Sequence, residues 1–211
     1  MKKCIKITLW VLGIIVLLIV ILALLTITPP LKYSYTVAEA EADSLLASEI
    51  VDMISDAVVD DEGNIPEIAV VTIPSENVNA LLRIAGYRLS RELEEEGIVC
   101  TFAWENGAIK AAGSYPLPLS KAAVGHALAS PLIENGKLNV SVSSLKLGHL
   151  PLPGSILSFH DITEKDIEDD AAKLAFDAIH SLSATPEGSL RIGVYPEKVS
   201  NLIRILITDD D

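Results

Sequence analysis

Apolar residues recur at helical spacing in several stretches of the chain. Between residues 42 and 58, Leu46, Ile50, Met53 and Ile54 fall every three or four positions, and acidic side chains lie between them. Pro74 and Ser75 open a second predicted helix that ends near Gly97. The core stripe of that helix is predicted to be Val78, Leu81, Leu82, Ala85, Leu89 and Leu93.

The C-terminal third of the chain contains two more predicted helices. Thr163 and Asp166 resemble a capping box, and apolar residues at helical spacing follow as far as Leu182, which predicts a helix over 164–182. A last helix is expected after Pro196, because proline is favoured in the first turn of a helix.

Alternation with period two predicts two β-hairpins, each with Glu-Asn-Gly at its turn. Asn106-Gly107 suits a two-residue turn that needs positive φ at both positions. Pairing Glu105 with Ala108 then gives the two strands a shared apolar face. In the second hairpin, around residues 134–136, the apolar face changes parity, and one extra residue near Ser143 would restore it, as a β-bulge does.

Three further segments complete the secondary structure. Residues 67–73 are predicted to form a strand that is buried on both faces, and residues 188–195 a second strand. Residues 120–130 fit a helix or a strand equally well. Together the elements predict an α+β fold, in which one bent antiparallel sheet packs on amphipathic helices.

An apolar run over residues 7–28 precedes this domain. It carries no charge and has about the 20 residues that a bilayer span requires. We interpret it as a transmembrane anchor; a cleaved signal peptide is the alternative, although such peptides have a shorter apolar core. The predicted organisation is a cytoplasmic N-terminus (1–6), the anchor (7–28), a linker (29–36) and an extracytoplasmic α+β domain (37–211).

Charge supports this single-pass orientation and limits the partners. Lys2, Lys3 and Lys6 precede the run, which keeps a short N-terminus in the cytoplasm, and the main domain outside it, at the cell membrane. These are 3 of the 16 lysines and arginines, whereas all 29 acidic residues follow the run, so the outer part has a formal charge of about −16. Such a surface repels nucleic acid and anionic lipid head groups, and no nucleic-acid partner is expected.

Motifs for catalysis or for a bound cofactor are missing from the sequence. The four histidines are scattered and no cysteine pair exists, so we expect no metal site and no cofactor. Ser143 and Lys146 match the letters of a serine acyl-enzyme motif, but that motif requires a helix. We therefore expect no enzyme. A hydrolase remains a third hypothesis, which loss of activity on replacing Ser143 or His160 would support.

The segment Leu-Gly-His-Leu-Pro-Leu-Pro, residues 147–153, and the apolar residues after it are the candidate binding surface. Its prolines exclude a helix and a central strand. The segment either packs against the domain or forms the rim of an apolar groove. The candidate ligand-binding residues are Leu147, Leu150, Leu152, Ile156, Leu157 and Phe159.

Residues 67–157 resemble the YpmS family of membrane-anchored bacterial proteins. The resemblance rests on the N-terminal anchor, on a strand-to-helix entry with Asn79 and Leu81, on Pro131, on Asn135-Gly136-Lys137-Leu138, and on Gly148 through Pro153. It implies an envelope location and an architecture, without an activity. Long helices against a bent sheet are also similar in arrangement to tubular lipid-binding domains.

These patterns favour a non-catalytic protein of the bacterial cell envelope. The leading hypothesis is binding of a lipid or another apolar envelope molecule in a groove between sheet and helices. The alternative is a structural role or the binding of an envelope protein partner, through the Leu-Pro segment or the acidic surface.

Overall fold

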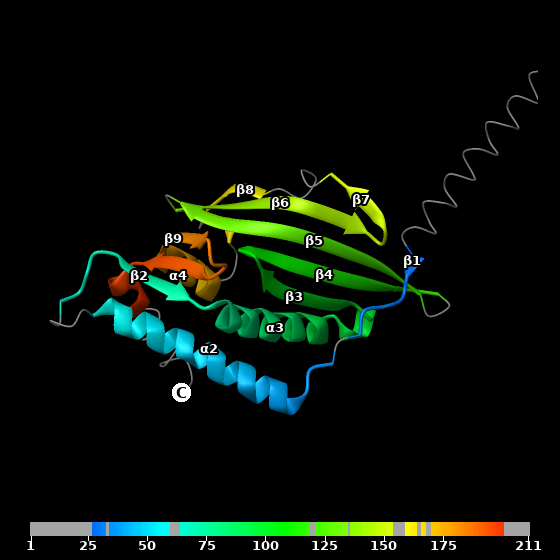
Figure 1. The fold of residues 1–211 in the computed structure, drawn as a ribbon, viewed down its shortest axis with the longest axis horizontal. Coiled ribbons are helices and arrows are strands. Elements are labelled where there is room, and N and C mark those ends of the chain that lie inside the picture. Colours follow the sequence, from blue (N-terminus) through cyan, green and yellow to red (C-terminus); the bar gives the residue numbers. More distant parts are fainter. Residues whose placement is uncertain are drawn as a thin grey trace, which may run out of the picture.

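One curled antiparallel sheet organises the computed structural model (Figure 1). The structure describes residues 27–32, 34–59, 64–118, 121–134, 136–153, 159–163, 166–167 and 170–200. Helices α2 (Val37–Val58) and α3 (Ser75–Glu92) lie below the sheet in Figure 1, and a short 3-10 turn (Glu94–Glu96) follows α3. The predicted α+β class is confirmed.

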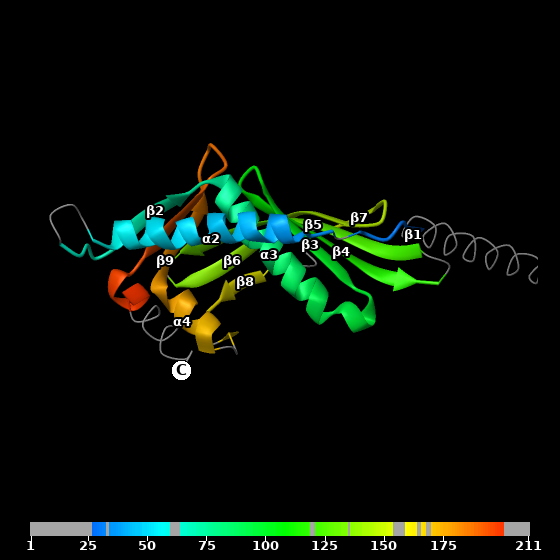
Figure 2. The same cartoon turned by 90° about the horizontal axis from the view of Figure 1, so that it is seen from below.

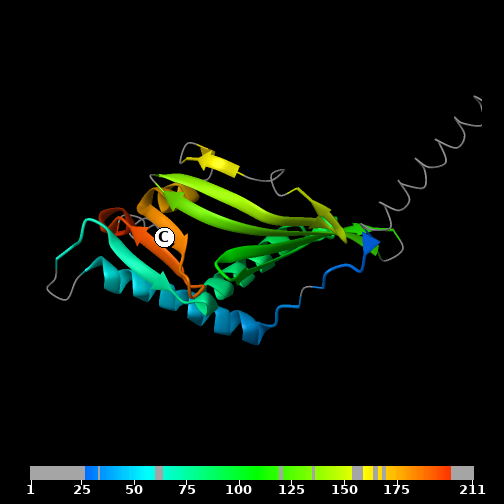
Figure 3. The same cartoon turned by 45° about the horizontal axis from the view of Figure 1, so that its top comes forward.

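The sheet is built around its longest described strand, β5 (Lys121–Glu134). β6 (Lys137–Leu147) pairs with one side of β5. The other side pairs first with β4 (Ala108–Leu117) and then, at Ile133, with β9 (Ile179–Ala184). β4 leads to β3 (Val99–Glu105), and β9 leads to β10 (Leu190–Val194) and β2 (Ala69–Ile73). The sheet therefore divides into two arms that curl into a half-barrel (Figure 3).

Three short strands extend the sheet. β7 (Leu150–Leu152) and β8 (Phe159–Ile162) pair with β6. β1 (Ile27–Thr28) pairs with the start of β5, through Ala122 and Ala123. β1 takes in the last two residues of the predicted anchor; residues 7–26 lie outside the described part of the chain. Within that part, no helix combines the length and the apolar character needed to cross a bilayer.

Both predicted hairpins are confirmed, including their registers. Glu105 pairs with Ala108 across a turn in which Asn106 and Gly107 have φ of 51° and 79°. In the second hairpin Glu134 pairs with Lys137. The predicted bulge is also present: Leu128 pairs with Ser144 and Ala129 with Val142, which leaves Ser143 as the extra residue. Residues 120–130, ambiguous by pattern, belong to β5 from Lys121 onward.

Two predicted elements differ from the structure. The helix expected over 164–182 is replaced by a short helix, α4 (Asp170–Ala178), and by β9, since Ile179–Ala184 pairs with β10. The strand at 67–73 exists as β2, but its burial alternates, and Val70 is 49% exposed. β2 pairs with β10 alone in the described sheet, so the predicted burial on both faces was wrong.

Helix α3 lies along the edge of β3, and its predicted core stripe is confirmed at Val78 and Leu82 but not at Leu81 and Ala85. Leu81 is 44% exposed and Ala85 is exposed, although both belong to the predicted core stripe. The residues that meet β3 are Asn79, Gly86 and Ser90. Asn79 Oδ1 accepts from the Trp104 backbone N–H at 2.7 Å, and its amide donates to the Trp104 carbonyl at 3.2 Å. Ser90 Oγ bonds the Cys100 backbone in the same two-way manner.

Helix α2 begins at a capping box and packs across α3 and β2 (Figure 2). Thr36 Oγ1 accepts from the Glu39 N–H, and the Glu39 carboxylate accepts from the Thr36 N–H at 2.7 Å. These bonds lower the pKa of the Glu39 carboxyl, because they stabilise its charged form.

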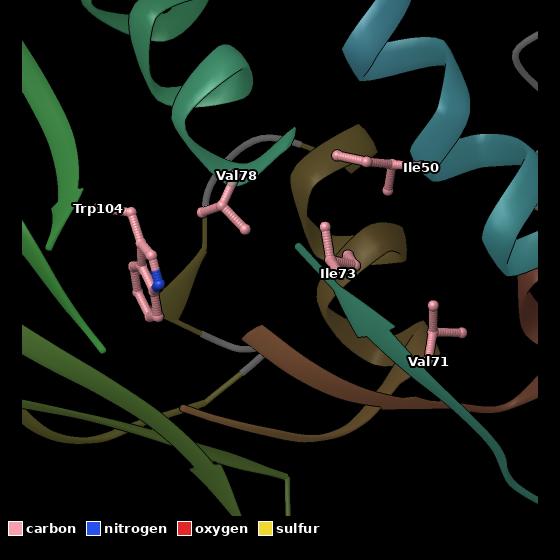
Figure 4. Packing of buried hydrophobic residues seen from close by; sticks show 5 residues of the cluster. All are labelled: Ile50, Val71, Ile73, Val78 and Trp104. Atoms are coloured by element: carbon pink, nitrogen blue, oxygen red, sulfur yellow. The ribbon is translucent and has the colours of Figure 1, made fainter. Parts of the chain in front are cut away.

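The hydrophobic core fills the arm of the sheet that contains β2 and β10. Ile50 from α2, Val71 and Ile73 from β2, Val78 from α3 and Trp104 from β3 form one buried cluster (Figure 4). The Trp104 indole N–H donates to the Gly188 carbonyl, which satisfies its polar atom inside the core. Of the residues of β3, Trp104 therefore belongs to this core cluster, whereas Cys100, at the other end of the strand, does not.

Candidate functional site

The Leu-Pro segment forms the short strand β7, which folds back on β6. Leu147 pairs with Leu150, Lys146 with Pro151 and Leu145 with Leu152, across a turn at Gly148 and His149. Leu147, Leu150 and Leu152 are half-buried. Among the other candidate residues, Ile156 and Leu157 lie outside the described residues, and Phe159 belongs to β8, where it pairs with Val140.

Strand registers place the three described leucines on one continuous face of the sheet. Directly paired residues of adjacent strands share a face, so one row runs from Phe102 through Ala111, Ala127 and Leu145 to Leu152. A second row runs from Cys100 to Leu150. We call these two rows the apolar face: Cys100, Phe102, Ala111, Gly113, Gly125, Ala127, Leu145, Leu147, Leu150 and Leu152.

The apolar face continues the core-side face of Trp104 but is not packed as tightly. All ten of its residues are half-buried, whereas Trp104, two residues along β3 from Phe102, is 4% exposed. A depression of about 250 Å³ lies on it, lined chiefly by Cys100, Phe102, Gly113, Gly125 and Leu145. Glycine and alanine on β4 and β5 make the depression possible, because their side chains leave the middle of the sheet bare.

The Cys100 thiol lies in this depression, and its environment agrees with the apolar lining. Burial raises the pKa of the Cys100 thiol, since a thiolate is poorly solvated among carbon atoms. A raised pKa makes the thiol less nucleophilic at neutral pH. Cys100 is therefore better suited to lining the depression than to acting as a nucleophile.

The opposite face of the same strands carries a larger groove, in which polar and charged side chains lie beside apolar ones. It has a volume of about 570 Å³ and is lined by Thr28, Pro29 and Leu31 on one side and by residues of β4, β5 and β6 on the other. We call it the N-terminal groove. His126 lies between Ala112 and Lys146 in register, and Lys110 lies two residues from Ala112 along β4. Leu128, Val124 and His149 complete much of its wall.

Charge in the N-terminal groove is partly compensated. Lys110 Nζ is 3.0 Å from Glu105 Oε1, and both side chains are about half exposed. Lys146 also lines the groove, and within the described ranges no carboxylate lies within ion-pair distance of it. Thr28 Oγ1 is buried and has no hydrogen-bond partner in the described part of the chain.

A metal-binding cluster is not found among the residues that the structure describes. Among those residues no three histidine, cysteine or acidic side chains form a cluster suited to a metal ion. Ser143 is the bulge residue, and its hydroxyl donates to the Leu128 carbonyl at 3.2 Å.

Sequence reasoning identified part of the apolar face and missed the rest. The leucines of 145–152 stand out by their density, and the predicted hairpin register already puts Cys100, Phe102, Ala111 and Gly113 on one face, whereas Gly125 and Ala127 show no distinguishing pattern. The available signal was the register of the first hairpin, which already joins Phe102 to Ala111. Residues 118–120 alone connect β4 to β5, but the pairing of these strands could not be derived because residues 120–130 fit a helix or a strand equally well.

Comparison of the chain with family models, curated proteins and solved structures finds no match. The resemblance to the YpmS family therefore stays a prediction.

Proposed function

We propose that this chain is a membrane-anchored, extracytoplasmic protein that binds a lipid or another apolar envelope molecule without catalysing a reaction. The observation that carries the proposal is the apolar face, which crosses five strands from β3 to β7 without a charged side chain. A monomer rarely leaves so wide an apolar surface half-buried unless something binds to it.

The nature of the occupant follows from the shape and composition of the face. Its depression is shallow and lined chiefly by alanine, glycine and larger apolar residues, and it offers carbon atoms with almost no polar partner. An acyl or prenyl chain needs no hydrogen bond and gains about 0.8 kcal/mol for each methylene buried. A polar metabolite would lose its hydration there without replacement.

The proposed location strengthens this choice. The apolar run of residues 7–28 ends at Thr28, where β1 joins the sheet. With the run in a membrane and the three N-terminal lysines in the cytoplasm, the sheet stands at the outer surface of the bilayer. Lipid is then the most abundant apolar molecule within reach.

Native mass spectrometry of the full-length chain in mild detergent, followed by solvent extraction, tests the proposal. We expect bound lipid at a defined stoichiometry, and Leu152→Asp should lower the bound fraction about tenfold or more, because a carboxylate would enter the apolar face. Leu132→Asp is the matched control, since Leu132 is 42% exposed on β5 and lies outside the apolar face.

The outcomes distinguish lipid binding at the apolar face from binding of a protein partner and from lipid binding elsewhere. Lipid that Leu152→Asp releases and Leu132→Asp retains supports the proposal. A protein that carries no lipid contradicts it and favours the second candidate, in which the same leucines contact an envelope protein partner. Lipid released equally by both variants would place the binding site elsewhere.

A further inference from the structure

From the N-terminal groove we infer a second binding site, on the face of the sheet opposite the apolar face, which holds the anionic head group of a membrane phospholipid. The inference rests on the membrane anchoring in the proposed function, but it does not require the apolar face to bind lipid. It assigns a role to residues that the proposed function leaves unused.

The first support is the sign of the charge. The chain has a formal net charge of −13, yet the groove gathers Lys110, Lys146, His126 and His149 against a single carboxylate, Glu105. Glu105 is already paired with Lys110. The Lys146 ammonium is left without a carboxylate within ion-pair distance in the described structure, which is the arrangement that an anionic ligand would complete.

The second support is the placement of the hydrogen-bond donors. His126 and Lys146 are cross-strand partners on β5 and β6, and adjacent partners on one face lie about 5 Å apart. Ser144 lies two residues from Lys146 on the same face and also lines the groove. A phosphate has several acceptor oxygens and can accept from ammonium, imidazole and hydroxyl groups together.

The third support distinguishes a lipid from a soluble anion. Pro29, Leu31, Val124 and Leu128 also line the groove, so an apolar wall stands beside the donors. In addition, the groove begins at Thr28, the last residue of the apolar run. A head group that projects from the membrane in which the chain is anchored reaches this site without leaving the bilayer.

The test is a titration of the full-length chain with phosphatidylglycerol or phosphatidylcholine of identical acyl chains, read by native mass spectrometry. We expect a preference for phosphatidylglycerol in the wild type, and Lys146→Glu should lower that preference about threefold or more. Lys121→Glu is the matched control, since Lys121 is an exposed lysine at the start of the same strand as His126 and outside the groove.

Comparing Lys146→Glu with Leu152→Asp in the same titration separates the head-group site from the apolar face. Loss of the phosphatidylglycerol preference in Lys146→Glu, and its retention in Lys121→Glu and Leu152→Asp, supports the head-group site. Equal binding of both lipids, unchanged by Lys146→Glu, overturns the head-group site and leaves the apolar face standing. Absence of every lipid overturns both.

Soluble glycerol 3-phosphate identifies the source of the anion. If millimolar glycerol 3-phosphate fails to displace phosphatidylglycerol, the lipid assignment holds, because the membrane-bound head group has the advantage of proximity. Displacement at equal concentrations would show that the groove takes a soluble phosphate ester, and would overturn the assignment to a lipid.

Discussion

Asp43 illustrates how one buried carboxylate fixes two helices against each other. It lies on α2 and is 3% exposed, and it accepts two hydrogen bonds from the Arg83 guanidinium of α3, one of them 2.8 Å from Nε. Tyr35, just before α2, donates a third at 3.0 Å. The Arg83 hydrogen bonds, and then that of Tyr35, hold the pKa of the Asp43 carboxyl below its usual range against the opposing effect of burial.

Replacing Asp43 with Asn should therefore destabilise the protein in a pH-dependent way. A carboxyl with a lowered pKa stabilises the fold above its unfolded-state pKa of about 3.9, and this contribution is lost as pH falls through the lower, folded-state pKa. We expect Asp43→Asn to lower the free energy of unfolding by roughly 1–3 kcal/mol at pH 7, and by clearly less at pH 3.

Urea unfolding of the full-length chain in detergent measures the difference, with Trp104 fluorescence in a Trp10→Phe background as the signal. Glu41→Gln, an exposed substitution on the same helix, is the control and should change the free energy of unfolding little at either pH. A deficit in Asp43→Asn that is the same at pH 7 and pH 3 would mean that the charge of Asp43 does not matter.

At the scale of elements, α3 closes an open edge of the sheet. Glu105 and Ala108 flank the two-residue turn, so the backbone groups of Cys100, Phe102 and Trp104 point away from β4. Asn79 and Ser90 satisfy the groups of Trp104 and Cys100. Between them Gly86 permits close approach, since a Cβ there would lie 3.2 Å from the Cys100 carbonyl oxygen. A helix with polar and small residues thus covers an edge that could otherwise pair with another chain.

The orientation of α3 against β3 can be tested with two alanine substitutions. Asn79→Ala leaves the Trp104 backbone N–H without its partner near the core and should lower the free energy of unfolding by about 1–3 kcal/mol. Leu81→Ala should cost well under 1 kcal/mol, because Leu81 is 44% exposed and alanine favours a helix. The same urea unfolding experiment compares them, and a larger loss for Leu81→Ala would mean that the Leu81 side chain faces the core.

Elements that depend on a few neighbouring residues could be predicted from the sequence. Elements that depend on pairing with residues far away in the sequence could not. The turn at Asn106-Gly107 and the extra residue at Ser143 follow from neighbouring letters, and both are confirmed. Ile179 and Leu182 continue a helical period, but β10 offers them a strand partner, and tertiary pairing outweighs a weak helical preference. The same limit applies to the site: Leu150 and Leu152 were found by composition, whereas Gly113 and Gly125 join them only through register.

For the molecule as a whole, the two faces of one sheet differ in chemistry. The apolar face offers carbon surface across five strands, and the N-terminal groove on the opposite face offers lysine, histidine and hydroxyl groups. The two faces differ because successive side chains along β4, β5 and β6 point to opposite faces of the sheet. The bulge at Ser143 shifts this alternation by one residue, so that Leu145 and Leu147 of β6 lie on the apolar face. The chain as a whole has a formal net charge of −13, so the lysines and histidines of the groove stand out against an acidic background.

Cys100 provides a chemical reporter for the occupancy of the apolar face. It is one of two cysteines in the chain, so a Cys4→Ser variant leaves a single thiol. Because burial raises the pKa of the Cys100 thiol, its alkylation should be slow at pH 7 and should accelerate as the thiolate fraction grows at higher pH. A bound acyl chain should slow it further, since the thiol lines the depression that the chain would fill.

We therefore expect removal of lipid by detergent exchange to raise the rate of maleimide labelling of Cys100 in the full-length Cys4→Ser chain several-fold at constant pH. Leu152→Asp should label rapidly before and after lipid removal, whereas Leu132→Asp should behave like its parent. Labelling that is unaffected by lipid in the parent would show that any bound lipid avoids the apolar face. A rise that Leu152→Asp abolishes would instead place the lipid along the row from Phe102 to Leu152, where strand register joins five strands into one surface.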